Sequence, residues 1–211
     1  MKTIICTLLI LAAAPVAMAS PCMYLPDFDL SIAMFRDGTD HQYPLSLMIV
    51  PDGSGEPLAE ARRPDGTVVN GQIIVYLLDW VGQGHEGMPP AEILLDAADG
   101  RLAFCTDGNM AGQATDSEGY TYFSAPLYGG GWVQDDLRVY VCNTPLAMPE
   151  LPLWINSPDI DGDLEVNLSD VQLFAEDFYG AYAYRSDLFY DGVVNLSDLG
   201  RLAQHLEADC N

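Results

Sequence analysis

The chain contains two copies of the pentapeptide Val-Asn-Leu-Ser-Asp, and this repeat constrains its fold more than any other feature. The copies occupy residues 166–170 and 194–198, an offset of 28 residues. The surrounding residues repeat in the same register, as three matched pairs show: Asp159 and Asp187, Asp163 and Asp191, and Ala175 and Ala203. Because the repetition covers a loop and the segment that follows it, it indicates a duplicated structural unit.

Each copy places oxygen-bearing side chains at positions 1, 5, 9 and 12 of a twelve-residue loop. Such a loop suits calcium, which takes about six to eight oxygen ligands, including the backbone carbonyl of position 7, whereas magnesium prefers a rigid octahedron. We therefore predict two calcium sites. The predicted ligands of the first loop are Asp159, Asp161, Asp163, Glu165, Asn167 and Asp170, and those of the second are Asp187, Asp191, Val193, Asn195 and Asp198.

The first loop is expected to bind calcium more tightly than the second. It offers one more carboxylate, because Phe189 occupies position 3 of the second loop. Leu164 opposes this difference, since it stands at position 6, where the chain of such a loop turns left-handed at a cost of about 1 to 2 kcal/mol for a residue with a Cβ. We expect the additional carboxylate to outweigh this strain.

An amphipathic helix is predicted after each loop. Apolar residues recur there at i, i+3, i+4 and i+7, which places them on one helix face, and the two helices are expected to pack on each other. These residues are Val171, Phe174, Ala175 and Phe178 in the first helix, and Leu199, Leu202, Ala203 and Leu206 in the second.

Residues 157–211 resemble a type I dockerin, whose duplicated loop D-x-[ND]-x-D-G-x-[VI]-N-x-x-D and following helix match residues 159–178 and 187–206. Leu164 and Phe189 depart from that pattern. The resemblance implies a small calcium-binding domain that docks to a cohesin domain through loop positions 10 and 11. These positions are occupied by Leu168, Ser169, Leu196 and Ser197, which could instead only support the helix starts.

Two other interpretations fit this segment less well. An EF-hand pair of another family is disfavoured, because each loop ends in Asp rather than Glu and is followed by a single helix. A disordered acidic tail has no reason to repeat two helical apolar stripes in register.

The preceding residues, from 43 to 156, have the pattern of a β-sandwich. Short runs rich in Val, Ile, Leu, Tyr and Phe alternate there with clusters of Gly, Pro, Asp and Asn. The predicted strands are 45–50, 72–80, 91–96, 102–105, 120–125, 137–142 and 151–155.

The stretch Thr-Asp-Ser-Glu-Gly-Tyr-Thr-Tyr-Phe at 115–123 resembles the TD-x-x-G-x-x-x-F hairpin of bacterial Ig-like domains of the invasin and intimin type. That resemblance implies a spacer or adhesion module, in which strands 72–79 and 91–97 pair. The triple glycine at 129–131 is interpreted as a flexible turn, because it lacks a P-loop lysine.

The expected fold class is therefore a mainly β, Ig-like sandwich with a small C-terminal α-helical, dockerin-like or EF-hand-like domain. The predicted parts are a signal peptide at 1–19, the sandwich at 20–156 and the dockerin-like domain at 157–211. Lys2, the apolar run that follows it and the small-residue site Ala17-Met18-Ala19 are typical of a cleaved secretory signal. We expect a secreted, extracellular or cell-surface protein with no transmembrane segment after cleavage.

Charge and cysteines are consistent with export. The formal net charge of −23 disfavours nucleic acid as a partner. The cysteines outside the signal peptide are even in number, which favours two disulfides over free thiols, and their spacing matches no zinc pattern. The candidates are Cys22, Cys105, Cys142 and Cys210. We favour pairing Cys105 with Cys142, which leaves Cys22 and Cys210 to join the chain ends.

The predicted function is a non-catalytic attachment or scaffold-binding protein that docks a cohesin-like or other extracellular protein in a calcium-dependent manner. The alternative is a carbohydrate-binding or polysaccharide-degrading component carried by a dockerin. A glycoside hydrolase needs a pair of carboxylates across a cleft, and the sequence nominates none. Aromatic residues that could stack on sugars are Trp80, Tyr120, Tyr122, Tyr128 and Trp132, although such residues in strands also serve as half-buried sheet positions.

Overall fold

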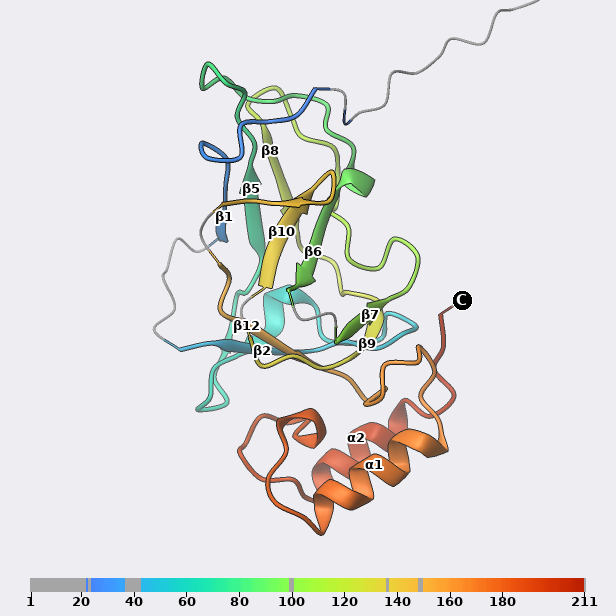
Figure 1. Ribbon diagram of the computed structural model, residues 1–211. Helices are drawn as coiled ribbons and strands as arrows, with labels where there is room; N and C mark the ends of the chain where they lie inside the picture. Colours follow the sequence, from blue (N-terminus) through green and yellow to red (C-terminus); the bar gives the residue numbers. More distant parts are fainter. Residues whose placement is uncertain are drawn as a thin grey trace, which may run out of the picture.

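The computed structural model describes residues 22, 24–36, 43–98, 101–135, 137–147 and 150–210. The predicted signal peptide, residues 1–19, lies outside this part of the chain. Short strands make up most of the regular structure up to residue 156, and two α-helices follow (Figure 1). None of the helices in the described residues is long and apolar enough to cross a membrane.

The strands form four small sheets, within which all pairs except one are antiparallel. The first has the order β1 (Ile32–Phe35), β5 (Ile73–Tyr76), β8 (Tyr120–Phe123), and the second the order β11 (Thr144–Pro145), β10 (Leu137–Val141), β6 (Ile93–Ala97). The third has the order β12 (Leu153–Asn156), β2 (Leu45–Met48), β3 (Ala61–Arg62), β4 (Val68–Val69), with β12 parallel to β2. The fourth pairs β7 (Leu102–Phe104) with β9 (Gly129–Gly131).

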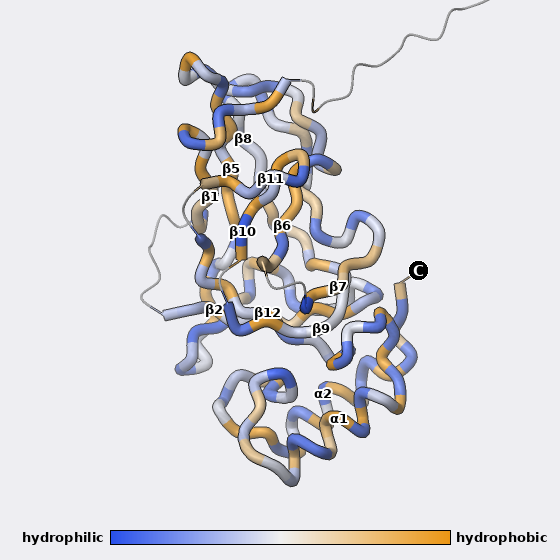
Figure 2. Tube along the Cα trace, viewed as in Figure 1, coloured by the Kyte–Doolittle hydropathy of each residue, from blue (hydrophilic) through white to orange (hydrophobic). Residues whose placement is uncertain are grey.

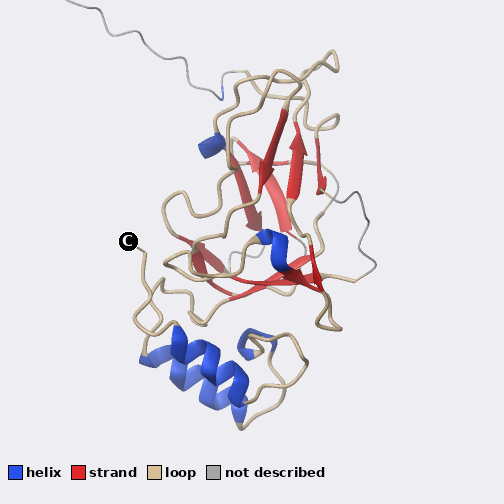
Figure 3. Ribbon diagram, turned by 180° about the vertical axis from the view of Figure 1, so that it is seen from behind, coloured by secondary structure: helices blue, strands red, loops and turns tan. Residues whose placement is uncertain are grey.

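The helices are short. Two α-helices, α1 (Leu168–Phe178) and α2 (Leu196–Gln204), lie side by side below the third sheet (Figures 1 and 3). Three single-turn 3₁₀ helices are η2 (Leu58–Glu60), η3 (Pro90–Glu92) and η4 (Tyr184–Ser186).

Alternation along the longer strands explains the main core. In β5, β6 and β10 every second side chain is buried, as a strand with one face on a core requires. Ile73, Ile93 and Val139 are examples of these inward residues. β2 is buried on both faces, because one face contacts the main core and the other contacts the C-terminal segment, residues 157–210.

Each predicted strand overlaps an observed one, but two predictions about the β-region, residues 24–156, were wrong. Strands 72–79 and 91–97 do not pair: β5 lies between β1 and β8, while β6 pairs with β10. The glycines 129–131 form the buried strand β9 rather than a flexible turn. Glycine is required there, because β7 lies so close that a Cβ at Gly129 would collide with the Ala103 carbonyl oxygen.

Both disulfides are present, and the favoured pairing was wrong. Cys22 bonds to Cys142, and Cys105 bonds to Cys210, with Cα–Cα distances of 5.8 and 5.6 Å. Cys105 and Cys142 follow strands that belong to different sheets, so they are not neighbours. Each terminal cysteine is therefore attached to the β-region, and the second bond holds the C-terminal segment against it.

The C-terminal segment packs on the β-region through a second apolar core. Met48 and Val50 from the β-region are buried there with Phe174, Leu188 and Leu202. Hydrophobic and hydrophilic residues are interspersed along both helices, as Figure 2 shows. The apolar contact therefore involves only part of the surface of each helix.

A buried ion pair crosses the same contact. The guanidinium of Arg201, on α2, donates to the Glu56 carboxylate at 2.8 Å and to the Leu188 carbonyl at 2.6 Å, and it lies 4.3 Å from the Phe189 ring centroid. The bond to Glu56 attaches the C-terminal segment to the β-region, whereas the contacts with Leu188 and Phe189 hold Arg201 in place within its own segment.

Candidate metal centre

The two repeated loops have the same left-handed backbone positions. Position 4 has a positive φ in both, at Gly162 (74°) and Tyr190 (58°), and so does position 6, at Leu164 (71°) and Gly192 (80°). The expected left-handed turn at Leu164 is therefore present. Because residues with a Cβ seldom adopt this conformation, its recurrence at equivalent positions shows that the duplication extends to the backbone.

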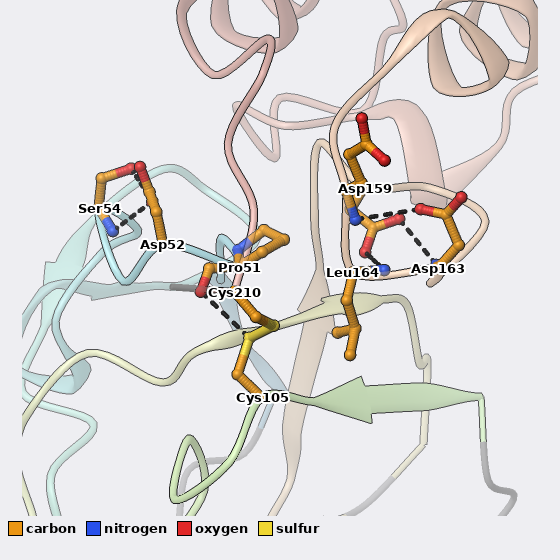
Figure 4. Close-up of a disulfide and its surroundings, with 9 residues drawn as sticks. Pro51, Asp52, Ser54, Cys105, Asp159, Asp163, Leu164 and Cys210 are labelled. Carbon is orange, nitrogen blue, oxygen red and sulfur yellow. Dashed lines mark hydrogen bonds between the residues drawn. A yellow bond between two sulfur atoms is a disulfide. The ribbon is translucent and has the colours of Figure 1, made fainter.

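The carboxylate at position 1 holds each loop together from inside. Asp159 Oδ1 accepts the amide of Gly162 at 2.9 Å, and Oδ2 accepts that of Leu164 at 2.9 Å (Figure 4). Asp187 likewise accepts the amides of Asp191 at 3.2 Å and Gly192 at 2.9 Å. In both copies the loop amides thus surround the buried carboxylate at position 1.

The carboxylate at position 12 joins each loop to its helix. Asp170 accepts the amides of Asn167 at 2.8 Å and Ile160 at 2.6 Å, and Asp198 accepts those of Asn195 at 2.9 Å and Phe189 at 3.0 Å. Together with the asparagine side chains, these carboxylates form a capping box at the start of α1 and of α2. Asn-x-x-Asp before an apolar run is the sequence signature of this cap, at Asn167 to Asp170 and again at Asn195 to Asp198.

In the first loop, three predicted ligands converge. Carboxylate oxygens of Asp159, Asp161 and Asp170 all lie within 4.8 Å of one another, and Asp159 and Asp170 are completely buried. The pKa of Asp159 is raised to about 7, because burial of the carboxyl, together with the nearby charge of Asp170, outweighs the lowering effect of the hydrogen bonds from the loop amides. Burial likewise raises the pKa of Asp170.

This donor set fits a hard divalent cation. Buried carboxylates close together repel one another, and a cation between them removes both that repulsion and the cost of desolvating the charges. The oxygen-only chemistry matches calcium, and neither cysteine nor histidine belongs to the group.

The remaining predicted ligands of the first loop are less constrained. Asp163 and Glu165 are exposed, and Asp163 Oδ1 accepts the Glu165 amide at 3.0 Å. Asn167 Oδ1 accepts the Ser169 amide at 2.7 Å as the helix cap. Asp163 and Asn167 each retain a further acceptor site that a cation could use.

The second loop brings fewer carboxylates together. Among the described residues, Asp187, Asp191 and Asp198 do not form a group as tight as that of the first loop. Position 3 is Phe189, whose ring lies against Arg201 instead of offering an oxygen. Asp187 also accepts the Tyr182 hydroxyl at 2.9 Å. Asn195 and the carbonyl of Val193 complete the predicted donors, and the Asn195 side chain caps α2 through the Ser197 amide.

The predicted partner-binding residues are exposed. Leu168 is 80% exposed and Leu196 is 71% exposed, and Ser169 and Ser197 are exposed beside them. Large apolar side chains at the first helical position of both helices therefore contact solvent rather than a core. This excludes hydrophobic support of the helix start as their role.

The β-region supplies residues to both loops that sequence reasoning missed. The Gly131 amide donates to the Asp159 carbonyl at 2.7 Å, and Gly130 lies against the Asp159 carboxylate. Near the second loop, buried Asn156 donates to the carbonyl of Asp187 at 2.8 Å and accepts the Tyr190 hydroxyl at 2.9 Å. The only signal in the sequence was the unusual run of three glycines.

The aromatic residues considered for sugar stacking are scattered. Trp80 is 82% exposed in the turn after β5, whereas Tyr120 stacks on Tyr76 with ring centroids 4.4 Å apart. The Arg36 guanidinium lies 6.0 Å from the ring centroid of Tyr122, on β8. Tyr128 precedes β9 and lies against Gly53, and Trp132 follows β9.

The chain was also compared with known proteins. No family model, curated protein or solved structure matches it. The function is therefore inferred from the residues and their geometry.

Proposed function

We propose that this protein is an exported, non-catalytic attachment protein whose C-terminal segment, residues 157–211, is a dockerin-like, EF-hand-like calcium module. The β-region, proposed to be an Ig-like sandwich, acts as its carrier. The module docks a cohesin-like or other extracellular protein when calcium is bound. Calcium occupies both loops, and the first loop binds it more tightly.

The observation that carries the calcium assignment is the convergence of Asp159, Asp161 and Asp170 inside the first loop. Two of these three carboxylates are completely buried. Buried like charges are costly unless a cation neutralises them, and the same loop conformation recurs in the second copy.

The docking assignment is supported by the exposed leucine and serine pairs. Leu168 with Ser169, and Leu196 with Ser197, occupy equivalent positions in the two copies and lie outside both cores. The two exposed leucines are large apolar side chains that a partner protein could cover. Because the two pairs are alike, either copy can present them to a partner.

Export is supported by the two disulfides, which form and persist mainly in oxidising compartments. They are also consistent with the proposed secreted or cell-surface location.

The docking proposal is tested with purified residues 20–211 and a panel of cohesin domains, in calcium and in excess EGTA. We expect binding in calcium that EGTA abolishes. The double variant Leu168→Asp, Leu196→Asp should bind calcium normally by calorimetry but lose the cohesin, because it changes only exposed side chains.

A matched control is Tyr179→Asp, which changes another exposed apolar residue of the same segment outside the two pairs. It should dock normally. Calcium binding with no cohesin captured would remove the docking assignment and leave the calcium assignment. Absence of calcium binding would remove both.

A further inference from the structure

A cavity of about 290 Å³ lies between the β-region and the C-terminal segment. None of the predicted calcium ligands lines it. Its β-region wall is formed by Trp132 and Gln134, which follow β9. Its other wall is formed by Asp177 at the end of α1 and by residues 182–185. Its volume is at the small end of the roughly 300 to 1,000 Å³ that ligand pockets occupy, so it suits a single ring or the end of a longer molecule.

Three aromatic side chains line this cavity: Trp132, Tyr182 and Tyr184. Tyr184 is fixed, because it is buried and lies edge-on to Trp154 with ring centroids 5.5 Å apart. Tyr182 is 52% exposed and is held by its hydroxyl, which donates to Asp187 at 2.9 Å. Trp132 is half-buried beneath the Arg101 guanidinium, which lies 4.9 Å from the ring centroid. The aromatic walls are thus pre-positioned by neighbouring groups.

The polar part of the lining includes the ion pair of Arg185 and Asp177, which has no net charge. Arg185 donates to the Asp177 carboxylate through Nε at 2.7 Å and Nη2 at 2.9 Å. Burial raises the pKa of Asp177, but the bonds from Arg185 and Ser186 lower it more, so the pair is ionised at neutral pH. The positive and negative charges compensate each other at close range, so the pair attracts neither a phosphate nor a free cation strongly.

Hydrogen-bonding capacity remains available around this pair. Arg185 Nη1 donates to no group among the described residues, and the side-chain amide of exposed Gln134 has no partner among them either. The lining therefore combines flat apolar faces with unpaired donors and acceptors and no net charge. A ligand complementary to it has an apolar face and several hydroxyl groups.

We propose that this cavity binds a neutral sugar ring, with Tyr182 and Trp132 contacting its apolar faces and Arg185 and Gln134 bonding its hydroxyls. This site goes beyond the docking function and uses none of the exposed leucine and serine pairs. Tyr182 connects it to the second loop through Asp187.

The proposal is tested by applying calcium-loaded protein to a glycan array of neutral, sulfated and sialylated glycans, followed by calorimetry with the neutral oligosaccharides that bind. We expect neutral glycans to bind, and Tyr182→Ala and Gln134→Ala each to weaken binding by roughly tenfold. Gln134 is exposed, so its variant tests the site even if Tyr182→Ala loses stability.

The matched control is Tyr179→Ala, which removes an 87% exposed tyrosine near the same turn that does not line the cavity. Its affinity for sugar should equal that of the unchanged protein. Binding to no neutral glycan, binding to anionic glycans alone, or equal losses in the Tyr179 and Gln134 variants would overturn the proposal. None of these outcomes depends on whether a cohesin docks.

Discussion

Gly130 lies directly against the carboxylate of Asp159, so closely that a Cβ at Gly130 would overlap the Asp159 Oδ2 atom. Gly130 belongs to β9, and Asp159 is the first residue of the first predicted calcium loop. The adjacent amide of Gly131 donates to the Asp159 carbonyl at 2.7 Å. A strand outside the loop therefore constrains the position of Asp159, one of the two completely buried predicted ligands of this loop.

Gly130→Ala is expected to weaken calcium binding at the first loop. The added methyl group displaces the Asp159 carboxylate, and changes that reorient a ligand typically cost roughly 10- to 100-fold in metal affinity. Calcium titration by calorimetry measures the effect. Gly200→Ala is the control, because a Cβ there meets no atom within 4 Å, and it should leave both sites unchanged. Equal affinity in the Gly130 variant would show that β9 does not position the ligand.

Asn156→Ala is expected to destabilise the contact between the β-region and the second loop. The buried Asn156 side chain donates to the carbonyls of Tyr184 at 3.1 Å and Asp187 at 2.8 Å and accepts the Tyr190 hydroxyl. Its removal leaves buried polar groups unpaired, at about 1 to 3 kcal/mol each.

Denaturant unfolding should therefore show a loss of at least about 2 kcal/mol for Asn156→Ala. Asn70→Ala is the matched control, because that exposed side chain bonds only with nearby Gln72, and its unfolding midpoint should change little. Equal midpoints for both variants would mean that the Asn156 bonds add nothing to stability.

The loops could be predicted from the sequence, and their attachment to the β-region could not. The repeated loop conformation and the helix starts depend on local spacing, which the repeated Val-Asn-Leu-Ser-Asp displays directly. The contacts of Asn156 with Asp187 and of Gly130 with Asp159 join residues distant in sequence, and no local pattern encodes them. Local alternation located seven strands between residues 45 and 156 but missed β3, β4, β9 and β11. The pairing of 72–79 with 91–97 was wrong, because strand pairing joins residues distant in sequence.

The buried face of each helix could also be predicted only in part from the sequence. Ala175 and Ala203 match the predicted apolar stripes but are exposed, while Phe174 and Leu202 are buried. The core that contains Phe174 and Leu202 also contains Met48 and Val50 from the β-region, but neither of these alanines. A segment that completes its core with residues from elsewhere cannot be delimited by its own periodicity.

Peptide mapping under non-reducing conditions should find Cys22 linked to Cys142 and Cys105 linked to Cys210. The second bond encloses a sequence separation of 105 residues and connects the C-terminal segment to the end of β7. Replacing both of its cysteines by serine should lower the free energy of unfolding by about 2 to 5 kcal/mol. A Cys105 to Cys142 peptide would contradict the arrangement of strands described above.

The last prediction concerns the unequal loops. Backbone strain does not distinguish them, because each contains one residue with a Cβ in the left-handed region. In the first loop this residue is Leu164 at position 6, with glycine at position 4, and in the second it is Tyr190 at position 4, with glycine at position 6. The strain costs are of the same order, about 1 to 2 kcal/mol each, so they approximately cancel.

The number of carboxylates then decides the order of affinity. The first loop brings Asp161 to the centre, where the second has Phe189, so the first loop should bind calcium more tightly. Calorimetry should resolve two sites, with Asp163→Ala removing the tighter and Asp191→Ala the weaker. Leu164→Gly should strengthen only the first site, because glycine adopts the left-handed conformation without a Cβ clash. If Asp191→Ala removed the tighter site instead, the carboxylate count could not be what sets affinity in these loops.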